Sequence, residues 1–347
     1  MNYLQRLFMR TPTRLWINNP TGEELQKAIT AGAICGTTNP SYCSALLKRE
    51  ADFIQAIIDK VIRETDDNEV AADIVYQRAT ARFMRAFLPL HEKSGAAQGF
   101  VTMQDNPNRD EDPQEIITAS ERHGRVGKNY MAKIPATEAG LEAMTLLIKK
   151  NIPICATECF SISQAISLCE LYEHTSRKCG KSPPFFVTHI TGILDEELKE
   201  YSEREDISID PKVLFQAGCL VARKQYQLIK KRGYRVTLLG GGARGTQHFT
   251  EFVGGDVHIT LNWSTIEDLL KEDLPVVSRI QAEADKEIVD ELSAKLPDFQ
   301  RAFHEDALVP KEYKNFAPLQ RFRNSFLRGW EHLLQAIEDR RSSCNGH

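Results

Sequence analysis

Eight short apolar segments with the composition of β-strands recur along the chain, and helix-like stretches lie between them. Short apolar runs rich in β-branched and aromatic residues indicate strands, whereas apolar residues three and four apart indicate helices. Because strands that alternate with helices usually run parallel, eight such units predict a closed (β/α)₈ barrel. The expected strands are Arg14–Asn18, Ala33–Thr37, Gly99–Gln104, Tyr130–Ile134, Ile152–Thr157, Pro184–His189, Arg235–Leu239 and Asp256–Leu261.

The stretches between these strands carry helix signals. Thr21 precedes two glutamates, so its hydroxyl can cap a helix whose positive end suits the acids. An open doubly wound sheet is the alternative architecture, but no strand is followed by the Gly-x-Gly-x-x-Gly sequence typical of one. The expected helices are Thr21–Ala31, Glu138–Lys150, Ser161–Tyr172, Pro211–Arg232 and Ser264–Lys271.

Three segments exceed the minimal barrel. Lys48–His91 has a helical pattern, Asp195–Asp210 is acidic and is expected to be an insertion after the sixth strand, and Val277–Arg341 is helical in composition. Since no linker or repeat divides the chain, we expect one domain over residues 1–347, with 277–341 as a helical extension packed on the barrel. Aromatic residues of this extension are expected to pack on the barrel, with a cofactor site as the alternative: Phe299, Phe303, Phe316, Phe322, Phe326 and Trp330.

The composition argues against several partner classes. The net charge is −4 and no apolar run approaches the roughly 20 residues that span a bilayer, so neither nucleic acid nor a membrane is an expected partner. Met1–Arg10 lacks the apolar stretch of a secretory signal, although its two arginines leave a transit peptide open. The eight cysteines are scattered, and Cys155 and Cys159 lack zinc-site spacing, so we expect reduced thiols, no metal and a cytoplasmic protein.

Polar residues stand where the predicted strands end, and in such barrels the carboxyl ends of the strands carry the chemistry. Lys133 is the sharpest signal, because it interrupts the otherwise uncharged strand Tyr-Met-Ala-Lys-Ile-Pro-Ala. Burial there would lower the pKa of its ammonium group and leave an amine able to attack a carbonyl, as in Schiff-base enzymes. A lysine that only reaches the solvent at the barrel mouth is the alternative interpretation.

Four segments, in matching order, resemble signature segments of the transaldolase family and of the related fructose-6-phosphate aldolases. The resemblance covers residues 14 to 270, and the helical tail suits the larger transaldolases. The matching residues are Gly36-Thr37-Thr38-Asn39-Pro40-Ser41, then Lys133-Ile134-Pro135-Ala136-Thr137 with Gly140-Leu141, then Thr157 with Phe160-Ser161 and Gln164-Ala165, and finally the arginine-bearing loop Gly240–Arg244.

The resemblance implies a role in sugar metabolism such as the pentose phosphate pathway, with a small-molecule ketose bound as an imine to Lys133. Cleavage between C3 and C4 would leave a dihydroxyacetone unit on the enzyme, which a transaldolase passes to an aldose and an aldolase releases by hydrolysis. No cofactor is implied, because the protonated imine is itself the electron sink. Members of the family range from monomers to larger rings, so a homo-oligomer is compatible with it.

The resemblance also assigns catalytic residues, and two of them depart from the family pattern. Thr157 matches the threonine that helps to hold the catalytic water, and Asn39 matches the asparagine that binds substrate hydroxyls. Gln104 stands where transaldolases have a glutamate and fructose-6-phosphate aldolases a glutamine. Asn18 stands where both have an acid–base aspartate, and an amide cannot accept a proton at neutral pH.

Three residues are candidates to replace the missing acid–base group, namely Glu158, Asp105 and His189. Strand alternation predicts that Glu158 faces away from Thr157 and therefore out of the site. His189 is consequently the preferred substitute.

The phosphate-binding residues implied by the resemblance are altered as well. Arg244 matches one family arginine, but the second falls at His189 or Gly192, and two family serines appear as Pro184 and Gly242. Thr38, Asn39, Cys155, His189 and Arg244 form the expected substrate-binding set, in which Cys155 replaces an asparagine. Three hypotheses follow: a transaldolase-type enzyme, a Schiff-base aldolase with an unphosphorylated or sulfonated substrate, or a catalytically impaired sugar-binding protein. Lys133 argues against the last, because a binding protein needs no charge in a barrel strand.

Gly240–Gly245 by itself would allow a nucleotide-binding loop as an alternative. The segment lacks the Gly-Lys-Ser/Thr ending of such loops, so a turn is favoured.

Overall fold

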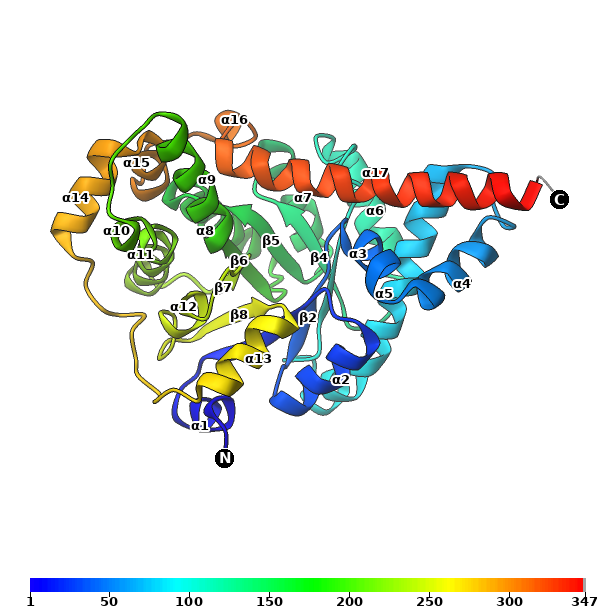
Figure 1. The fold of residues 1–347 in the computed structure, drawn as a ribbon, viewed down its shortest axis with the longest axis horizontal. Helices are drawn as coiled ribbons and strands as arrows, with labels where there is room; N and C mark the ends of the chain where they lie inside the picture. The colour runs from blue at the N-terminus through cyan, green and yellow to red at the C-terminus, as the bar shows by residue number, and fades with distance from the viewer. Residues whose placement is uncertain (346–347) are drawn as a thin grey trace.

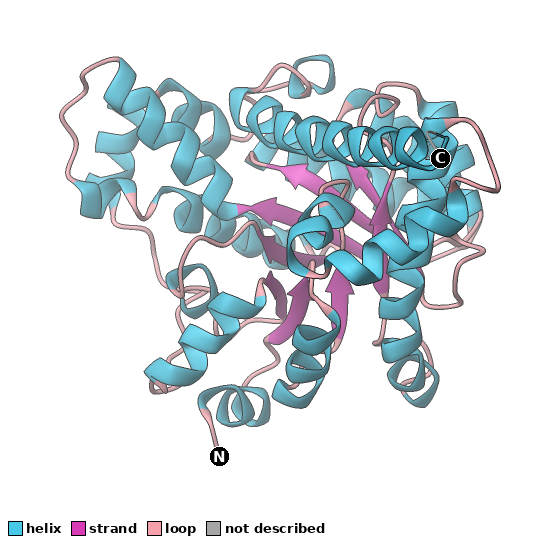
Figure 2. Cartoon of the chain, turned by 45° about the vertical axis from the view of Figure 1, so that its right-hand side comes forward, coloured by secondary structure: helices cyan, strands magenta, loops and turns pink. Residues whose placement is uncertain are grey.

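A closed barrel of eight parallel strands in chain order forms the centre of the computed structural model, which describes residues 1–345 (Figures 1 and 2). The first strand pairs with the eighth, so the predicted (β/α)₈ barrel is confirmed and the open sheet is wrong. All predicted strands are present, with ends shifted by at most two residues. They are β1 (Arg14–Asn18), β2 (Cys35–Thr37), β3 (Val101–Gln104), β4 (Tyr130–Pro135), β5 (Ile154–Cys159), β6 (Phe185–Ile190), β7 (Thr237–Gly241) and β8 (Val257–Leu261).

The helices between the strands follow the sequence signals with two differences. The Thr21 hydroxyl caps α2 (Gly22–Ala31). The carboxylate of Glu24 accepts a hydrogen bond from the backbone amide of Thr21 and so completes a capping box. The helices α7 (Glu138–Lys149) and α13 (Trp263–Glu272) lie where they were expected, whereas α8 (Ile162–Cys179) is longer. The expected helix Pro211–Arg232 is divided into α10 (Pro211–Leu214) and α11 (Ala217–Arg232).

The segments beyond the minimal barrel are helical. Lys48–His91 lies within α3 (Tyr42–Arg49), α4 (Ala51–Val61) and α5 (Asn68–Lys93). The acidic segment Asp195–Asp210 lies in α9 (Thr191–Arg204), which begins directly at the end of β6, and in the loop that follows this helix. The remaining helices are α1 (Tyr3–Arg10), α6 (Pro113–His123), α12 (Gln247–Thr250), α14 (Lys286–Lys295), α15 (Pro297–Phe303), α16 (Pro310–Tyr313) and α17 (Ala317–Asn345).

The long helix α17 runs across one end of the barrel (Figures 1 and 2). Phe299, Phe303 and Phe316 of the C-terminal extension pack among apolar residues of α9 and α11, as expected. Phe322 and Phe326 of α17 differ, because they reach the cavity at the carboxyl ends of the strands. The C-terminal extension therefore contributes to the site as well as to packing.

An apolar layer fills the barrel beneath that cavity. It is formed by inward-facing side chains of successive strands, and it gives the cavity a closed floor. The layer consists of Trp16, Cys35, Phe100, Met131, Cys155, Phe186 and Leu239.

None of the helices between residues 1 and 345 combines the length and apolar character needed to cross a bilayer.

Candidate active site

A cavity of about 190 Å³ opens at the carboxyl ends of the strands, and we call it the mouth cavity. Side chains from most of the barrel strands and from α17 line it, and most of its strand-derived groups are hydroxyls and amides. Such a lining suits a polyhydroxylated ligand, since hydroxyls and amides can both donate and accept hydrogen bonds. The lining residues are Asn18, Thr37, Asn39, Ser41, Lys133, Thr157, Thr188, Ile190, Gly241, Gly242, Ala243, Arg244, Thr260, Asn262, Phe322, Ser325 and Phe326.

Lys133 projects from β4 into the mouth cavity with only 6% of its surface exposed. Its Nζ donates to the carbonyl oxygen of Thr38 at 3.0 Å and lies 5.8 Å from the ring centre of Phe326. Burial lowers the pKa of this amine, and the nearby Cys155 and Glu158 only partly oppose the effect. Within residues 1–345 no carboxylate forms a salt bridge with Lys133, so burial shifts the amine toward its uncharged, nucleophilic form.

Asn18 lies at the rim of the mouth cavity in a chain of side-chain hydrogen bonds. Its Oδ1 accepts from the Thr37 hydroxyl at 2.8 Å, and its Nδ2 donates to Asn262 Oδ1 at 2.8 Å. The hydroxyls of Thr37 and Thr260 are 2.7 Å apart and extend the chain to β8. The amide is therefore fixed in orientation, but it offers no group that can accept a proton.

Glu158 is turned toward the barrel interior, so the expectation that strand alternation sends it outward is wrong. Its φ is +57°, and the pairing of β5 with β6 is irregular between Ala156 and Cys159. A positive φ costs a residue other than glycine about 1–3 kcal/mol and persists only where its surroundings hold it. Here Gln104, which pairs with Lys133 in register, donates from Nε2 to Glu158 Oε1 at 2.7 Å.

Three buried oxygens near Lys133 have no hydrogen-bond partner within the described chain: Glu158 Oε2, Gln104 Oε1 and Thr157 Oγ1. Burial, together with the charge of Asp110, raises the pKa of Glu158 to about 8. Thr157 lines the mouth cavity, whereas Glu158 and Gln104 lie beside it and are joined to each other. Since buried polar groups are normally paired, such a group of free oxygens suits a site that binds a molecule or moves a proton.

His189 lies on the other side of the barrel wall, so its expected role as acid–base substitute is wrong. Thr188 lines the cavity, and the next residue in the strand must face outward. His189 Nε2 accordingly lies 3.1 Å from the carbonyl oxygen of Gly218 in α11, and the ring is fully buried. Burial lowers its pKa to about 3, which keeps the ring neutral.

Two further residues of the expected substrate-binding set do not line the cavity with their side chains. The Thr38 hydroxyl bonds the Tyr76 hydroxyl at 2.7 Å, and only its carbonyl oxygen faces Lys133. Cys155 belongs to the apolar layer below, where its Sγ lies 3.2 Å from the Thr188 hydroxyl. Both side chains pack behind the residues that line the cavity, so neither can bind a substrate there.

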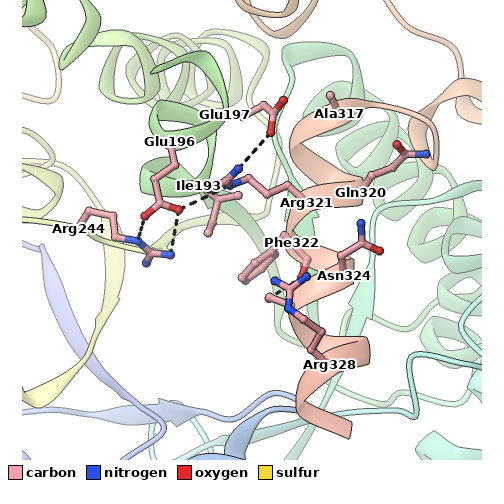
Figure 3. A pocket seen from close by; sticks show the side chains of 11 residues that line it. Ile193, Glu196, Glu197, Arg244, Ala317, Gln320, Arg321, Phe322, Asn324 and Arg328 are labelled. Carbon is pink, nitrogen blue, oxygen red and sulfur yellow. Dashed lines mark hydrogen bonds and ion pairs between the residues drawn. The ribbon is translucent and has the colours of Figure 1, made fainter. Parts of the chain in front are cut away.

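Arg244 reaches away from the glycine-rich turn after β7 and forms an ion pair with Glu196 of α9, at 2.6 Å between Nε and Oε1 (Figure 3). Gly242 has a φ of +64°, as a tight turn at the cavity rim requires. Arg244 also borders a second, outer basin of about 580 Å³ beside the mouth cavity, bounded by α9 and α17. Glu196 lies 3.8 Å from Arg321 as well, so its carboxylate is shared by two guanidinium groups (Figure 3).

Several cavity residues were not predicted from the sequence. Thr260 and Asn262 stand at the end of β8 and were detectable by the strand-end rule that selected the other residues. Phe322, Ser325 and Phe326 carry no such signal, because they belong to a helix far along the chain. Among residues 1–345, no group of three or more His, Cys, Asp or Glu side chains is arranged to hold a metal ion.

The chain matches the family model for transaldolase/fructose-6-phosphate aldolase over residues 15–325. A transaldolase of Helicobacter pylori strain Shi470 is 33% identical over 141 residues, which are 39% of this chain and 42% of that protein. A second, from Helicobacter pylori strain ATCC 700392 / 26695, is 24% identical over 61% of this chain and 63% of its own length. One from Renibacterium salmoninarum is 27% identical, covering 61% of this chain and 59% of that protein. The matched region thus spans less than two thirds of each of these relatives.

Proposed function

The chain belongs to the transaldolase/fructose-6-phosphate aldolase family, and on that premise we propose that Lys133 forms a Schiff base with a ketose. Aldol cleavage would then leave a dihydroxyacetone unit on Lys133, for transfer to an aldose or for release by hydrolysis. The observation that carries the proposal is a nearly buried amine in a polar cavity at the catalytic end of the barrel. Burial lowers the pKa of this amine and so shifts it toward the neutral nucleophile that imine formation requires.

The cavity residues support the steps after imine formation. The protonated imine withdraws electrons from the bond between C3 and C4 as that bond breaks, so the leaving fragment departs as an aldehyde. Asn39, Asn18 and the threonine hydroxyls line the cavity and would bind the hydroxyls of the donor. The ring centre of Phe326 lies 5.8 Å from Lys133 Nζ, so this side chain would limit the access of water to the amine.

Borohydride trapping tests the proposal directly. Incubation with dihydroxyacetone or fructose 6-phosphate followed by reduction is expected to add one reduced sugar unit to the peptide that contains Lys133, as measured by mass spectrometry. An adduct confined to another lysine would refute the assignment. Adding glyceraldehyde 3-phosphate or erythrose 4-phosphate as acceptor then separates transfer, which yields a new ketose, from hydrolytic cleavage.

A second candidate, an aldolase for unphosphorylated ketoses, is favoured by the ion pair between Arg244 and Glu196. A phosphate group would have to displace the Glu196 carboxylate before Arg244 could bind it. Both side chains are more than a third exposed, so the ion pair is worth up to about 1 kcal/mol and the carboxylate is a modest competitor.

Glu196→Gln is therefore expected to raise the ratio of kcat/KM for fructose 6-phosphate to that for fructose by up to about fivefold, in line with the loss of one exposed ion pair. Steady-state kinetics with both sugars measures the ratio. Glu200→Gln is the matched control, because Glu200 pairs with Arg321 and not with Arg244. An unchanged ratio in Glu196→Gln would show that this ion pair does not select the substrate.

A further inference from the structure

We propose that Glu158 is the acid–base group for imine formation and hydrolysis at Lys133, a role that rests on the proposed function. The geometry points to it in three ways. The backbone departs from strand alternation at this residue, and its carboxyl group meets Gln104, the neighbour that pairs with Lys133 in register. Gln104 fixes one carboxyl oxygen at 2.7 Å and leaves the other without a partner inside the described chain. The group is also close enough to Lys133 for their charges to interact.

The surroundings of Glu158 suit a group that gains and loses a proton. Lys133 of β4 faces it, and so do Asp110 from the loop after β3 and Arg323 of α17. Asp110 and Arg323 pair with each other through contacts of 2.8–3.0 Å, so most of their charge is mutually compensated. Burial is the largest influence, and it raises the pKa of Glu158 to about 8, where both protonation states are populated near neutral pH.

The proton balance of the reaction matches this position. When the amine has added to the ketone, the protonated carboxyl group donates its proton to the carbinolamine hydroxyl. The C–O bond breaks, water leaves, and the nitrogen lone pair forms the C=N bond of a cationic imine beside a carboxylate. In hydrolysis the carboxylate takes a proton from the attacking water while the oxygen bonds to the imine carbon. The carboxyl group is thus regenerated in each cycle.

No other described group near Lys133 fits the role. Cys155 is the second residue whose charge would act on Lys133, but burial raises the pKa of its thiol and keeps it protonated. Asn18 carries an amide, and His189 lies outside the barrel wall. Asp105 has a pKa raised to about 6 by burial, but the charged groups that act most strongly on it are His123, Asp73 and Arg122, none of which lines the mouth cavity.

Glu158→Gln in the full-length protein tests the proposal, because it keeps the size of the side chain and its partner Gln104 while removing the proton. We expect Lys133 still to be trapped by borohydride after long incubation, with kcat/KM lower by about 10²-fold. In the wild type, kcat/KM should fall as the pH rises through about 8, since the donor must be protonated, and Glu158→Gln should lose this limb. Asp105→Asn is the control, and its limb near pH 8 should remain.

The outcomes separate this inference from the proposed function. A wild-type adduct at Lys133 together with unchanged turnover and pH profile in Glu158→Gln would overturn the role of Glu158 and leave the Schiff base standing. Absence of any wild-type adduct would overturn both. If Glu158→Gln does not fold, as judged by circular dichroism, the wild-type profile decides: a limb near pH 8 supports the assignment, and a flat profile between pH 7 and 9 overturns it.

Discussion

Replacing Lys133 by methionine is expected to abolish borohydride trapping and to lower turnover by roughly 10⁴- to 10⁶-fold, the scale of losing a covalent nucleophile. Methionine is similar in length and fills the same space, but it has no lone pair able to form an imine. The fold should persist, because the lysine is buried without a salt bridge within residues 1–345 and its removal relieves the cost of burying an amine. Thermal unfolding should therefore show a midpoint at or above that of the wild type.

The matched control for this variant is Lys150→Met. Lys150 is exposed directly after the end of α7, pairs with Glu121 on the surface and does not line the mouth cavity. Its turnover and its trapping at Lys133 should equal those of the wild type. Retained turnover in Lys133→Met, measured with the substrate that traps best, would refute the Schiff-base mechanism.

Asn18→Asp is expected to raise the rate of aldol cleavage of fructose 6-phosphate by about 10²- to 10⁴-fold, the usual contribution of a positioned acid–base group. The C4 hydroxyl must lose its proton as the bond between C3 and C4 breaks, and the amide of Asn18 cannot take it. A carboxylate fits the same position, since Thr37 already donates to Oδ1 at 2.8 Å. Asn262 can turn its amide so that it donates instead of accepting.

Measurement of kcat for release of glyceraldehyde 3-phosphate decides this prediction. Asn262→Asp provides the control, because it adds a carboxylate to the same rim one hydrogen bond away from position 18. Only a charge at position 18 should produce the large gain. If Asn18→Asp leaves the cleavage rate unchanged while Lys133 is still trapped, the limiting proton is removed by another group. The role proposed for Glu158 concerns water at the imine carbon, so the two variants probe different steps.

The sequence by itself determined the barrel and the place of Lys133 in it. The alternation of short apolar runs with helical patterns fixed the strands to within two residues, because both patterns arise from local repeats that burial imposes. Lys133 was detectable because a charge inside an uncharged strand stands out against that repeat. Asn18 and Thr157 followed from the rule that parallel strands place their carboxyl ends at one rim.

The tertiary structure alone decided which way the side chains around Lys133 face and which carboxylate pairs with Arg244. One backbone angle at Glu158 reverses the side that strict alternation assigns, and no pattern in the sequence specifies that angle. The acid–base role predicted for His189 is wrong because the side chain faces away from the cavity and contacts α11. Phe326 reaches Lys133 from a helix distant in sequence, and Glu196 pairs with Arg244 across 48 residues of the chain. Contacts of this kind depend on how separate elements pack together, and local periodicity carries no information about them.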